Sequence, residues 1–318
     1  MISSYALAID LGGTTAKCAL IYNEKIIDRI IIKTKKNEIL ENIYINILPL
    51  LEKNKLEQSD LIFIGITICG LIDYQKGISI WAGNLQWNNY KVIDKLRELF
   101  KIENIYILND SKSATYGEYV KGINKEKSSM LLYTIGTGLG GGVILNHELY
   151  FGNNTRLASE PGHSGGFQNK YQCNCNLLGC IEGLSSATGI ERELNNNYAY
   201  FSKRLNTQKD WIEIKDIYNL FQINDKKTIN ILKSSLTPLA KHIAVSLHLM
   251  DFEIIVIGGG PSALGKNLIT IIKDILKDYL LPSFYKKLDL RIAKLGNDAG
   301  IWGRYYWSKE KFKNDYPI

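Results

Sequence analysis

The chain has 318 residues, 45% of them hydrophobic and 22% charged, which is the composition of an ordinary globular protein of about two domains. A small disulfide-stabilised scaffold and a disordered chain are therefore excluded. Lys and Arg number 39 against 32 Asp and Glu, a mild excess without basic runs that suits an anionic substrate and predicts no nucleic-acid partner. No apolar run approaches about 18 residues, and Asp10 interrupts the N-terminus before a signal-peptide core could form, so we expect a cytoplasmic protein with no membrane partner.

Short apolar and β-branched segments predict strands, and segments with helical apolar spacing predict the helices between them. The predicted strands are, in chain order, Tyr5–Leu11, Cys18–Tyr22, Lys25–Lys33, Leu61–Ile68, Asn104–Leu108, Met130–Ile135, Gly142–Leu145 and Phe252–Ile257. The predicted helices are Glu38–Leu51, Val92–Phe100, Thr228–Leu249 and Asp298–Lys309. Because proline has no N–H and clashes with the preceding turn, Pro238 is expected to kink or break the third of these helices.

The order of strands and helices in the first third of the chain restarts at Ser129, which predicts an α/β protein of two similar halves with a cleft between them. We expect a smaller first domain over residues 1–109 with a C-terminal helix of about residues 298–318, and a larger second domain over residues 110–297. Ligands bind outside the carboxyl ends of parallel strands. The loops expected to face the site are those after Ile9, Ile68, Leu108, Ile135 and Ile257.

Two glycine-rich loops that follow predicted strands are suited to phosphate, because glycine lets the backbone approach a ligand closely. The first consists of Asp10, Leu11, Gly12, Gly13, Thr14 and Thr15, although such a turn could equally close a hairpin with Asp10 in solvent. The second begins with Gly136, Thr137 and Gly138 and matches the dinucleotide pattern G-x-G-x-x-G, but a strand follows where that pattern requires a helix. We therefore interpret the second loop as a hairpin that wraps a phosphate tail.

A third glycine loop, formed by Gly258, Gly259 and Gly260, is suited to the flat face of a nucleoside. The residues from Gly260 to Asn267 are one short of a Walker A motif and lie between a predicted strand and a helix. However, Asn267 replaces the Ser or Thr that would bind Mg²⁺, and too few residues follow for the rest of a P-loop sheet. A P-loop NTPase therefore stays a minor alternative.

The strongest local pattern of the chain consists of His163, Cys173, Cys175 and Cys180, which stand within 18 positions. Three thiolates and one imidazole are a ligand set suited to tetrahedral Zn²⁺. The alternative, buried free thiols beside an unrelated histidine, is disfavoured because the loop is rich in Gln, Asn and Lys. We expect a structural ion that holds one ring nitrogen of His163 and leaves the other for a ligand hydroxyl.

Asp110 follows Asn109 at the end of a predicted strand. This position is typical of a catalytic carboxylate whose amide neighbour holds a polyol hydroxyl. The alternative is that Asp110 only caps a helix that begins near Ser111.

Motifs along essentially the whole chain resemble those of the ROK family of sugar kinases, repressors and related proteins. The matching segments are AIDLGGTT (8–15), GITICGLID (65–73), GNLQW (83–87), LND (108–110), IGTGLGGG (135–142), EPGH (160–163), CNCNLLGCIE (173–182), IGGGPS (257–262) and LGNDAG (295–300). EPGH together with the cysteine loop is highly specific for the family. The resemblance implies the actin/hexokinase-like ATPase fold, with two RNase H-like domains and an interdomain cleft, and it implies a homodimer.

The resemblance also implies a role for each matching residue, with Asp110 as the general base. The residues implied to hold the sugar are Gly70, Asn84, Asn109, Glu160, His163 and Glu182. The residues implied to meet ATP and Mg²⁺ are Asp10, Gly12, Gly13, Thr14, Thr15, Gly136, Thr137, Gly138, Gly258, Gly259 and Gly260. The residues implied to bind structural Zn²⁺ are His163, Cys173, Cys175 and Cys180. The chain departs from the family at Cys69, where Pro is usual, at Asn176, where Gly is frequent, and at Ser111 and Lys112, whose charge is expected near the phosphates or in solvent.

Together these roles predict an ATP-dependent hexose kinase that acts on the 6-hydroxyl of an aldohexose. Glucose is favoured, because Asn84 and the stretch Ser186–Ile190 resemble glucokinases and Leu71 stands where some N-acetylmannosamine kinases have Arg. A kinase for N-acetylmannosamine or N-acetylglucosamine is the alternative within the family. A non-catalytic sugar-binding regulator is the alternative of another class, and a DNA-binding repressor is disfavoured because the position of Asp10 leaves no room for a preceding DNA-reading helix.

Overall fold

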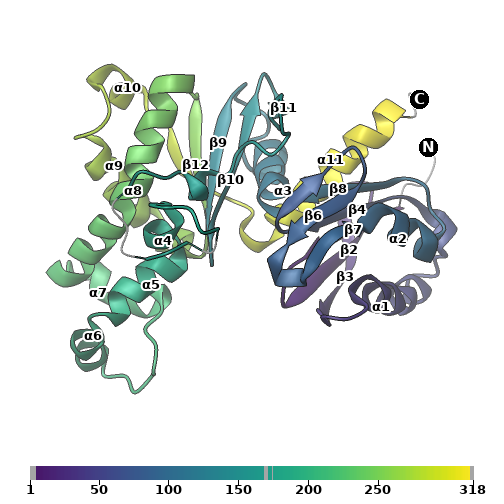
Figure 1. Ribbon diagram of the computed structural model, residues 1–318, viewed down its shortest axis with the longest axis horizontal. Coiled ribbons are helices and arrows are strands. Elements are labelled where there is room, and N and C mark those ends of the chain that lie inside the picture. Colours follow the sequence, from purple (N-terminus) through teal and green to yellow (C-terminus); the bar gives the residue numbers. More distant parts are fainter. Residues whose placement is uncertain (1–4, 168–170, 174, 316–318) are drawn as a thin grey trace. The chain divides into compact units, whose positions relative to one another are not determined.

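The computed structural model describes residues 5–167, 171–173 and 175–315 (Figure 1). Asn174 of the cysteine motif and the last residues of the expected C-terminal helix, 316–318, lie outside the described residues. The chain divides into two compact units. Unit 1 comprises residues 1–126, 149–158 and 297–318, and unit 2 comprises residues 127–148 and 159–296.

A five-stranded sheet in the order β3-β2-β1-β4-β8 forms the centre of unit 1. Its strands are β1 (Tyr5–Leu11), β2 (Thr15–Tyr22), β3 (Lys25–Lys33), β4 (Leu61–Ile68) and β8 (Ile105–Asn109). The first three strands form an antiparallel meander, and β4 and β8 continue the sheet parallel to β1. These five strands confirm the predicted ones, with bounds that differ by up to three residues.

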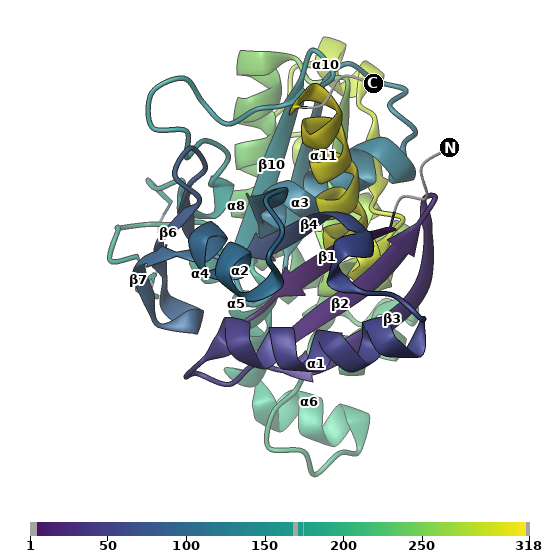
Figure 2. The same cartoon turned by 90° about the vertical axis from the view of Figure 1, so that its right-hand side faces the viewer.

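Helices cover both faces of this sheet (Figure 1). Their bounds are α1 (Ile39–Lys53), α2 (Val92–Phe100), α3 (Asp110–Gly117) and α11 (Ala299–Asp315). The turned view shows α1 beside the edge strand β3 (Figure 2). Because successive side chains of a strand point to opposite faces, Leu7 and Ile9 of β1 enter the core that α1 and α2 cover, whereas Asp10 faces α11.

Unit 1 extends beyond residue 109, where the sequence predicted a domain boundary, because α3 packs closely on α11. A Cβ atom added to Gly303 would lie 1.6 Å from the carbonyl oxygen of Ser113. A Cβ atom added to Gly117 would lie 2.3 Å from the carbonyl oxygen of Ala299. Glycine at both positions therefore lets the two backbones approach, and this contact holds α3 in the first unit.

We expect Gly303→Ala to destabilise unit 1, because the added methyl group forces α3 and α11 apart. Overpacking of this kind typically costs about 1–3 kcal/mol, and here the clash is with backbone rather than with a flexible side chain. The measurement is Tm by circular dichroism. Gly260→Ala is the matched control, since a Cβ atom there meets nothing within 4 Å. Equal Tm values for the two variants would contradict the prediction.

A second, three-stranded sheet of unit 1 was not predicted. Its strands are β5 (Leu71–Asp73), β6 (Ile78–Ala82) and β7 (Trp87–Lys91). The strands are short, and the polar residues of β7 give a weak signal of period two. Between β6 and β7 a 3₁₀ helix over Gly83–Leu85 carries Asn84.

Unit 2 contains a five-stranded sheet in the order β11-β10-β9-β12-β13. Its strands are β9 (Met130–Ile135), β10 (Leu139–Leu145), β11 (Glu148–Leu149), β12 (Ile254–Gly259) and β13 (Leu290–Ile292). The pairing of β9 with β10 is antiparallel, and β12 is parallel to β9. The predicted hairpin is confirmed, although β10 begins at Leu139, earlier than expected, because pairing with β9 stabilises a glycine-rich segment whose side chains carry no strand signal.

The helices of unit 2 pack on this sheet around a core that includes Tyr133, Leu239 and Ile257. Their bounds are α4 (Glu182–Ser185), α5 (Ala187–Asn195), α6 (Tyr198–Leu205), α7 (Tyr218–Gln222), α8 (Lys226–Met250), α9 (Lys266–Leu276) and α10 (Pro282–Lys287). Of the predicted kink or break at Pro238, the break is wrong, because α8 runs through Pro238 and the neighbouring Leu236 and Leu239 are fully buried. Across the described residues, every helix is too short or too polar for a bilayer span.

Candidate functional site

The carboxyl ends of β1, β4 and β8 lie at one edge of the unit 1 sheet. Asp10 of β1 pairs with Thr67 of β4, and Ile68 of β4 pairs with Asn109 of β8. The first glycine loop, the Cys69–Gly70 turn and Asp110 follow these strands. The structure therefore brings together the three segments of unit 1 that the sequence assigned to a site.

The Asp10 carboxylate bonds to one other strand and lies close against a helix. The Thr67 hydroxyl donates to its Oδ1 at 2.8 Å, and a Cβ atom on Gly300 would lie 3.2 Å from its Oδ2. Gly300 belongs to the first turn of α11, whose backbone dipole favours a negative charge there. Sequence reasoning missed Thr67 and Gly300 as neighbours of Asp10. The available signal was Gly300 of LGNDAG, which stands in the first turn of a predicted helix.

The first glycine loop is a tight turn whose neighbour is Asn84. The Gly12 N–H donates to the Thr15 carbonyl at 2.9 Å, and the Thr34 hydroxyl donates to the Gly12 carbonyl at 2.9 Å. A Cβ atom on Gly13 would lie only 2.9 Å from the Cβ of Asn84. An expected phosphate loop and an expected sugar residue are thus in contact within unit 1.

Asn109, rather than Asp110, caps the helix that follows β8. Its Oδ1 accepts from the backbone N–H groups of Ser111 at 3.0 Å and Lys112 at 3.1 Å, and its Nδ2 donates to the Gly70 carbonyl at 3.2 Å. Asp110 is the first residue of α3, and its exposed carboxylate accepts from the Ser111 N–H at 2.8 Å. The capping alternative therefore applies to Asn109, and the Asp110 side chain stands at the surface of the sheet edge.

Cys69 lies near both Asn84 and Asp110 at this sheet edge. The Asn84 amide hydrogen-bonds its sulfur. Burial, and after it the charge of Asp110, raises the pKa of Cys69 to about 11. The thiol is therefore neutral at physiological pH and shares its surroundings with an expected sugar residue and the expected base.

The structure places two of the residues at which the chain departs from the family. The Lys112 side chain is only 2% exposed, so the expectation of a solvated charge is wrong. Asn176 has φ 63°, a left-handed conformation that asparagine tolerates better than most residues after glycine. Asn176 can therefore replace glycine in the cysteine loop.

Two glycine loops of unit 2 follow adjacent parallel strands, because Gly258 and Gly259 of β12 pair with the last residues of β9. Gly259 has φ 93°, and a Cβ atom there would lie 2.1 Å from the Ile135 carbonyl oxygen. The hairpin turn closes with the Gly136 N–H donating to the Gly138 carbonyl at 2.9 Å. Both loops thus present backbone at one sheet edge.

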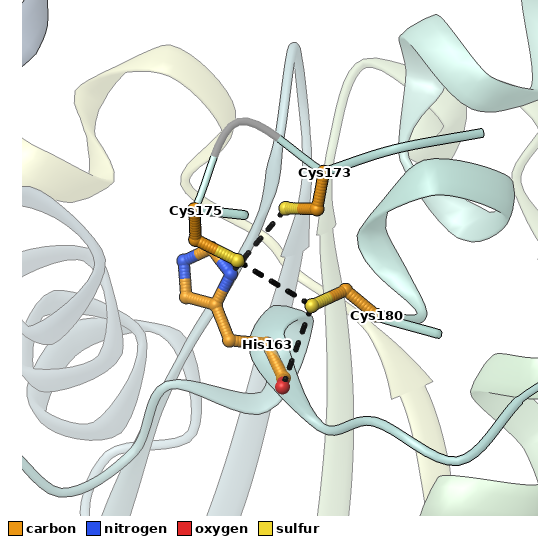
Figure 3. A group of neighbouring side chains, drawn as sticks. All are labelled: His163, Cys173, Cys175 and Cys180. Atoms are coloured by element: carbon orange, nitrogen blue, oxygen red, sulfur yellow. Dashed lines mark hydrogen bonds between the residues drawn. The ribbon is translucent and has the colours of Figure 1, made fainter. Parts of the chain in front are cut away.

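Figure 3 shows His163, Cys173, Cys175 and Cys180 pointing toward one another. Their ligand atoms all lie within 4.8 Å of one another. The Cys175 and Cys180 sulfurs are 3.5 Å apart, and the Cys173 sulfur is 3.7 Å from Nδ1 of His163. Sulfur ligands about 2.3 Å from a tetrahedral zinc lie about 3.8 Å apart, so the two short separations match this ion and the widest one must close by about 1 Å.

The charges around Cys173 also favour a cation. Burial, and after it the hydrogen bonds that the thiol donates to Cys175 and Glu182, raises the pKa of Cys173 to about 12. A cluster without a metal therefore keeps this thiol protonated at neutral pH. Three thiolates beside the Glu182 carboxylate require a bound cation to balance them.

Glu182 links the cysteine loop to the β9–β10 hairpin. Its Oε2 accepts from the Leu139 N–H at 2.9 Å, and its Oε1 accepts from the Cys173 thiol at 3.4 Å. A Cβ atom on Gly138 would lie 2.4 Å from Oε2. The EPGH turn packs on the same hairpin, because a Cβ atom on Gly162 would lie 2.1 Å from the Leu139 carbonyl oxygen. The expected sugar residues of unit 2 are thus fixed relative to the expected phosphate hairpin.

Comparison with known proteins decides the family, since the ROK family matches residues 6–311. The chain belongs to the ROK family. It is 33% identical to a glucokinase of Halalkalibacterium halodurans, over 98% of this chain and 97% of that protein. It is 28% identical to an N-acetylmannosamine kinase of Haemophilus influenzae, over 96% of this chain and 95% of that protein.

Two solved ROK structures share the fold. One is a glucokinase from Streptomyces griseus in complex with glucose and AMPPNP, with TM-score 0.80, 23% identity and coverage of 96% of this chain and 100% of that chain. The other is a ROK family transcriptional regulator, with TM-score 0.85, 20% identity and coverage of 98% and 79%. At these identities the likeness concerns the fold alone, and it confirms the predicted actin/hexokinase-like α/β fold. The P-loop alternative is therefore wrong, and Gly260–Leu264 forms a short 3₁₀ helix instead.

Proposed function

We propose that this chain is an ATP-dependent hexose kinase that phosphorylates the 6-hydroxyl of an aldohexose, with glucose preferred. The observation that carries the proposal is the exposed Asp110 carboxylate at the carboxyl end of β8, on the sheet edge that also holds Asp10 and the first glycine loop. The similarity to proteins named glucokinase and N-acetylmannosamine kinase supports a kinase.

Phosphoryl transfer depends on positioning and on charge stabilisation. Asp110 accepts the proton of the 6-hydroxyl while the hydroxyl oxygen bonds to the γ-phosphorus, the bond to the β–γ bridging oxygen breaks, and ADP leaves. The amides of Asn84 and Asn109 hold sugar hydroxyls; Asn109 retains one amide hydrogen beyond its bond to Gly70. Asp10 would orient an Mg²⁺ ion, which would neutralise the phosphate charge.

In unit 2, the Gly136–Gly138 turn and the Gly258–Gly260 loop bind ATP through their backbone, while Glu160, His163 and Glu182 hold sugar hydroxyls. His163, Cys173, Cys175 and Cys180 would hold Zn²⁺, which would shape this loop. Nδ1 of His163 faces the cluster, and Nε2 would be left for the sugar. In the zinc-bound form Cys173 would be a thiolate and could not donate its present hydrogen bond to Oε1 of Glu182. That oxygen would then be available to a sugar hydroxyl.

Two residues support glucose over N-acetylmannosamine. Asn84 is exposed beside the first glycine loop, and Leu71 at the start of β5 provides no polar partner for an acetamido group. A buried amide without a partner costs about 1–3 kcal/mol. Within the stretch Ser186–Ile190, Ser186 supports neither sugar, because it caps α5 through the Gly189 N–H at 3.0 Å and is 2% exposed.

The decisive experiment measures kcat/KM for glucose, N-acetylmannosamine, N-acetylglucosamine and mannose at saturating MgATP. We expect glucose to be preferred by about 10-fold or more, which corresponds to about 1.4 kcal/mol of transition-state binding. A preference of that size for N-acetylmannosamine would overturn the sugar and leave the kinase standing. Sugar binding without ADP release for any of the four would instead indicate a regulator. The homodimer implied by the family resemblance stays a prediction.

A further inference from the structure

A chain of hydrogen bonds crosses unit 2 between the EPGH turn and β9. The Ser164 hydroxyl lies 2.9 Å from Nε2 of His242, and Nδ1 of His242 lies 2.7 Å from the Tyr133 hydroxyl. The Tyr133 hydroxyl lies 3.4 Å from the hydroxyl of Ser246. The rings of Tyr133 and His242 meet edge to face, with centroids 5.7 Å apart. His242 and Ser246 belong to α8, so this helix is joined both to the turn and to the strand.

The bond that Ser246 makes within α8 favours one direction for this chain. The Ser246 hydroxyl donates to the His242 carbonyl at 2.9 Å, so its oxygen accepts from Tyr133. With Tyr133 donating to Ser246, its hydroxyl accepts from Nδ1–H of His242, and we assign Nε2 as the acceptor for the Ser164 hydroxyl. Burial lowers the pKa of His242, which is consistent with the neutral ring that this pattern needs.

Ser164 is attached to the metal cluster on two sides. It follows His163 directly in the chain, and its carbonyl accepts from the Ile181 N–H at 3.1 Å. Ile181 stands between Cys180 and Glu182. The Cys180 thiol lies 3.6 Å from the His163 carbonyl oxygen, so the two segments that Ser164 joins also meet at the cluster.

We propose that His242 is a positioning residue for the metal cluster: by accepting the Ser164 hydroxyl it anchors the turn that carries His163 to α8. The proposal rests on the zinc site of the proposed function. It assigns a role to His242, which lies 62 positions after Cys180 and belongs to none of the ligand motifs in the sequence. Outer partners that orient metal ligands typically contribute 10–100-fold to metal affinity.

The test compares zinc release from the full zinc-loaded chain to a chromophoric chelator, with no use of kinase activity. His242→Gln keeps an acceptor near the position of Nε2 and retains the bond to Ser164. His242→Asn keeps a donor near the position of Nδ1 and retains only the bond to Tyr133. Ser164→Ala removes the hydroxyl itself. We expect His242→Asn and Ser164→Ala each to weaken zinc binding about 10–100-fold, and His242→Gln to stay close to the unmodified chain.

Combining His242→Asn with Ser164→Ala should weaken zinc binding no further than either change alone, because both remove the same bond. Equal zinc release from His242→Gln and His242→Asn, or unchanged release from Ser164→Ala, would overturn the proposal. Lower Tm with unchanged zinc affinity would also overturn it, since that is the signature of a packing role alone. An unmodified chain that binds no zinc overturns the metal site together with this proposal, and is recognised before any variant is made.

Discussion

Asp110→Asn should lower kcat by at least about 10²-fold, the lower range for loss of a general base. Asparagine keeps the shape of the side chain and cannot accept the proton of the 6-hydroxyl. The helix should be unaffected, because its cap is Asn109, whose Oδ1 holds the Ser111 and Lys112 N–H groups. Sugar affinity should change much less than kcat, since the proposed sugar contacts come from other residues.

The measurement pairs steady-state kinetics with calorimetric sugar binding. Asp94→Asn is a matched control, because it removes one carboxylate from an exposed site in the first turn of α2. Cys69 provides an internal check: since the Asp110 charge helps to raise its pKa, that pKa should fall in Asp110→Asn and stay unchanged in Asp94→Asn. A folded Asp110→Asn variant with near-normal turnover would contradict the role of Asp110 as base.

Cys175→Ser should release the zinc ion and raise the KM for the sugar by about 10-fold or more. A neutral serine hydroxyl is a poor zinc ligand compared with a thiolate. Without the ion, the cluster keeps a protonated Cys173, whose thiol donates to Oε1 of Glu182. That carboxylate oxygen is then unavailable to a sugar hydroxyl, and His163 loses the partner that fixes its ring.

Metal content should be measured on protein purified without added zinc, with one ion per chain expected for the unmodified protein. Cys69→Ser is the control for metal content, because it removes a thiol in unit 1 and leaves the four ligands intact. The KM for ATP should change less than the KM for the sugar in Cys175→Ser. Bound zinc at full occupancy in Cys175→Ser, or a metal-free unmodified chain with intact activity, would refute the zinc site.

The strands of the unit 1 five-stranded sheet, the helices α1, α2, α8 and α11 and the ligand motifs follow from the sequence alone, because their signals are local. The apolar run in Tyr5–Leu11 and the apolar spacing in Val92–Phe100 need no tertiary information, and the structure confirms both. The four ligands from His163 to Cys180 lie in one loop, so residue type and spacing were sufficient to group them. The glycine loops were likewise readable as strand ends with permissive backbone.

Contacts between distant segments were decided by tertiary structure. The bond between Asp10 and Thr67 depends on the register of β1 against β4, and the approach of Gly300 to Asp10 depends on where α11 docks. The continuity of α8 through Pro238 has the same origin, because packing on both sides of the proline outweighs its local preference. His242 shows the limit most clearly: no motif surrounds it, and its role arises from two hydroxyl groups that only the fold brings to its ring.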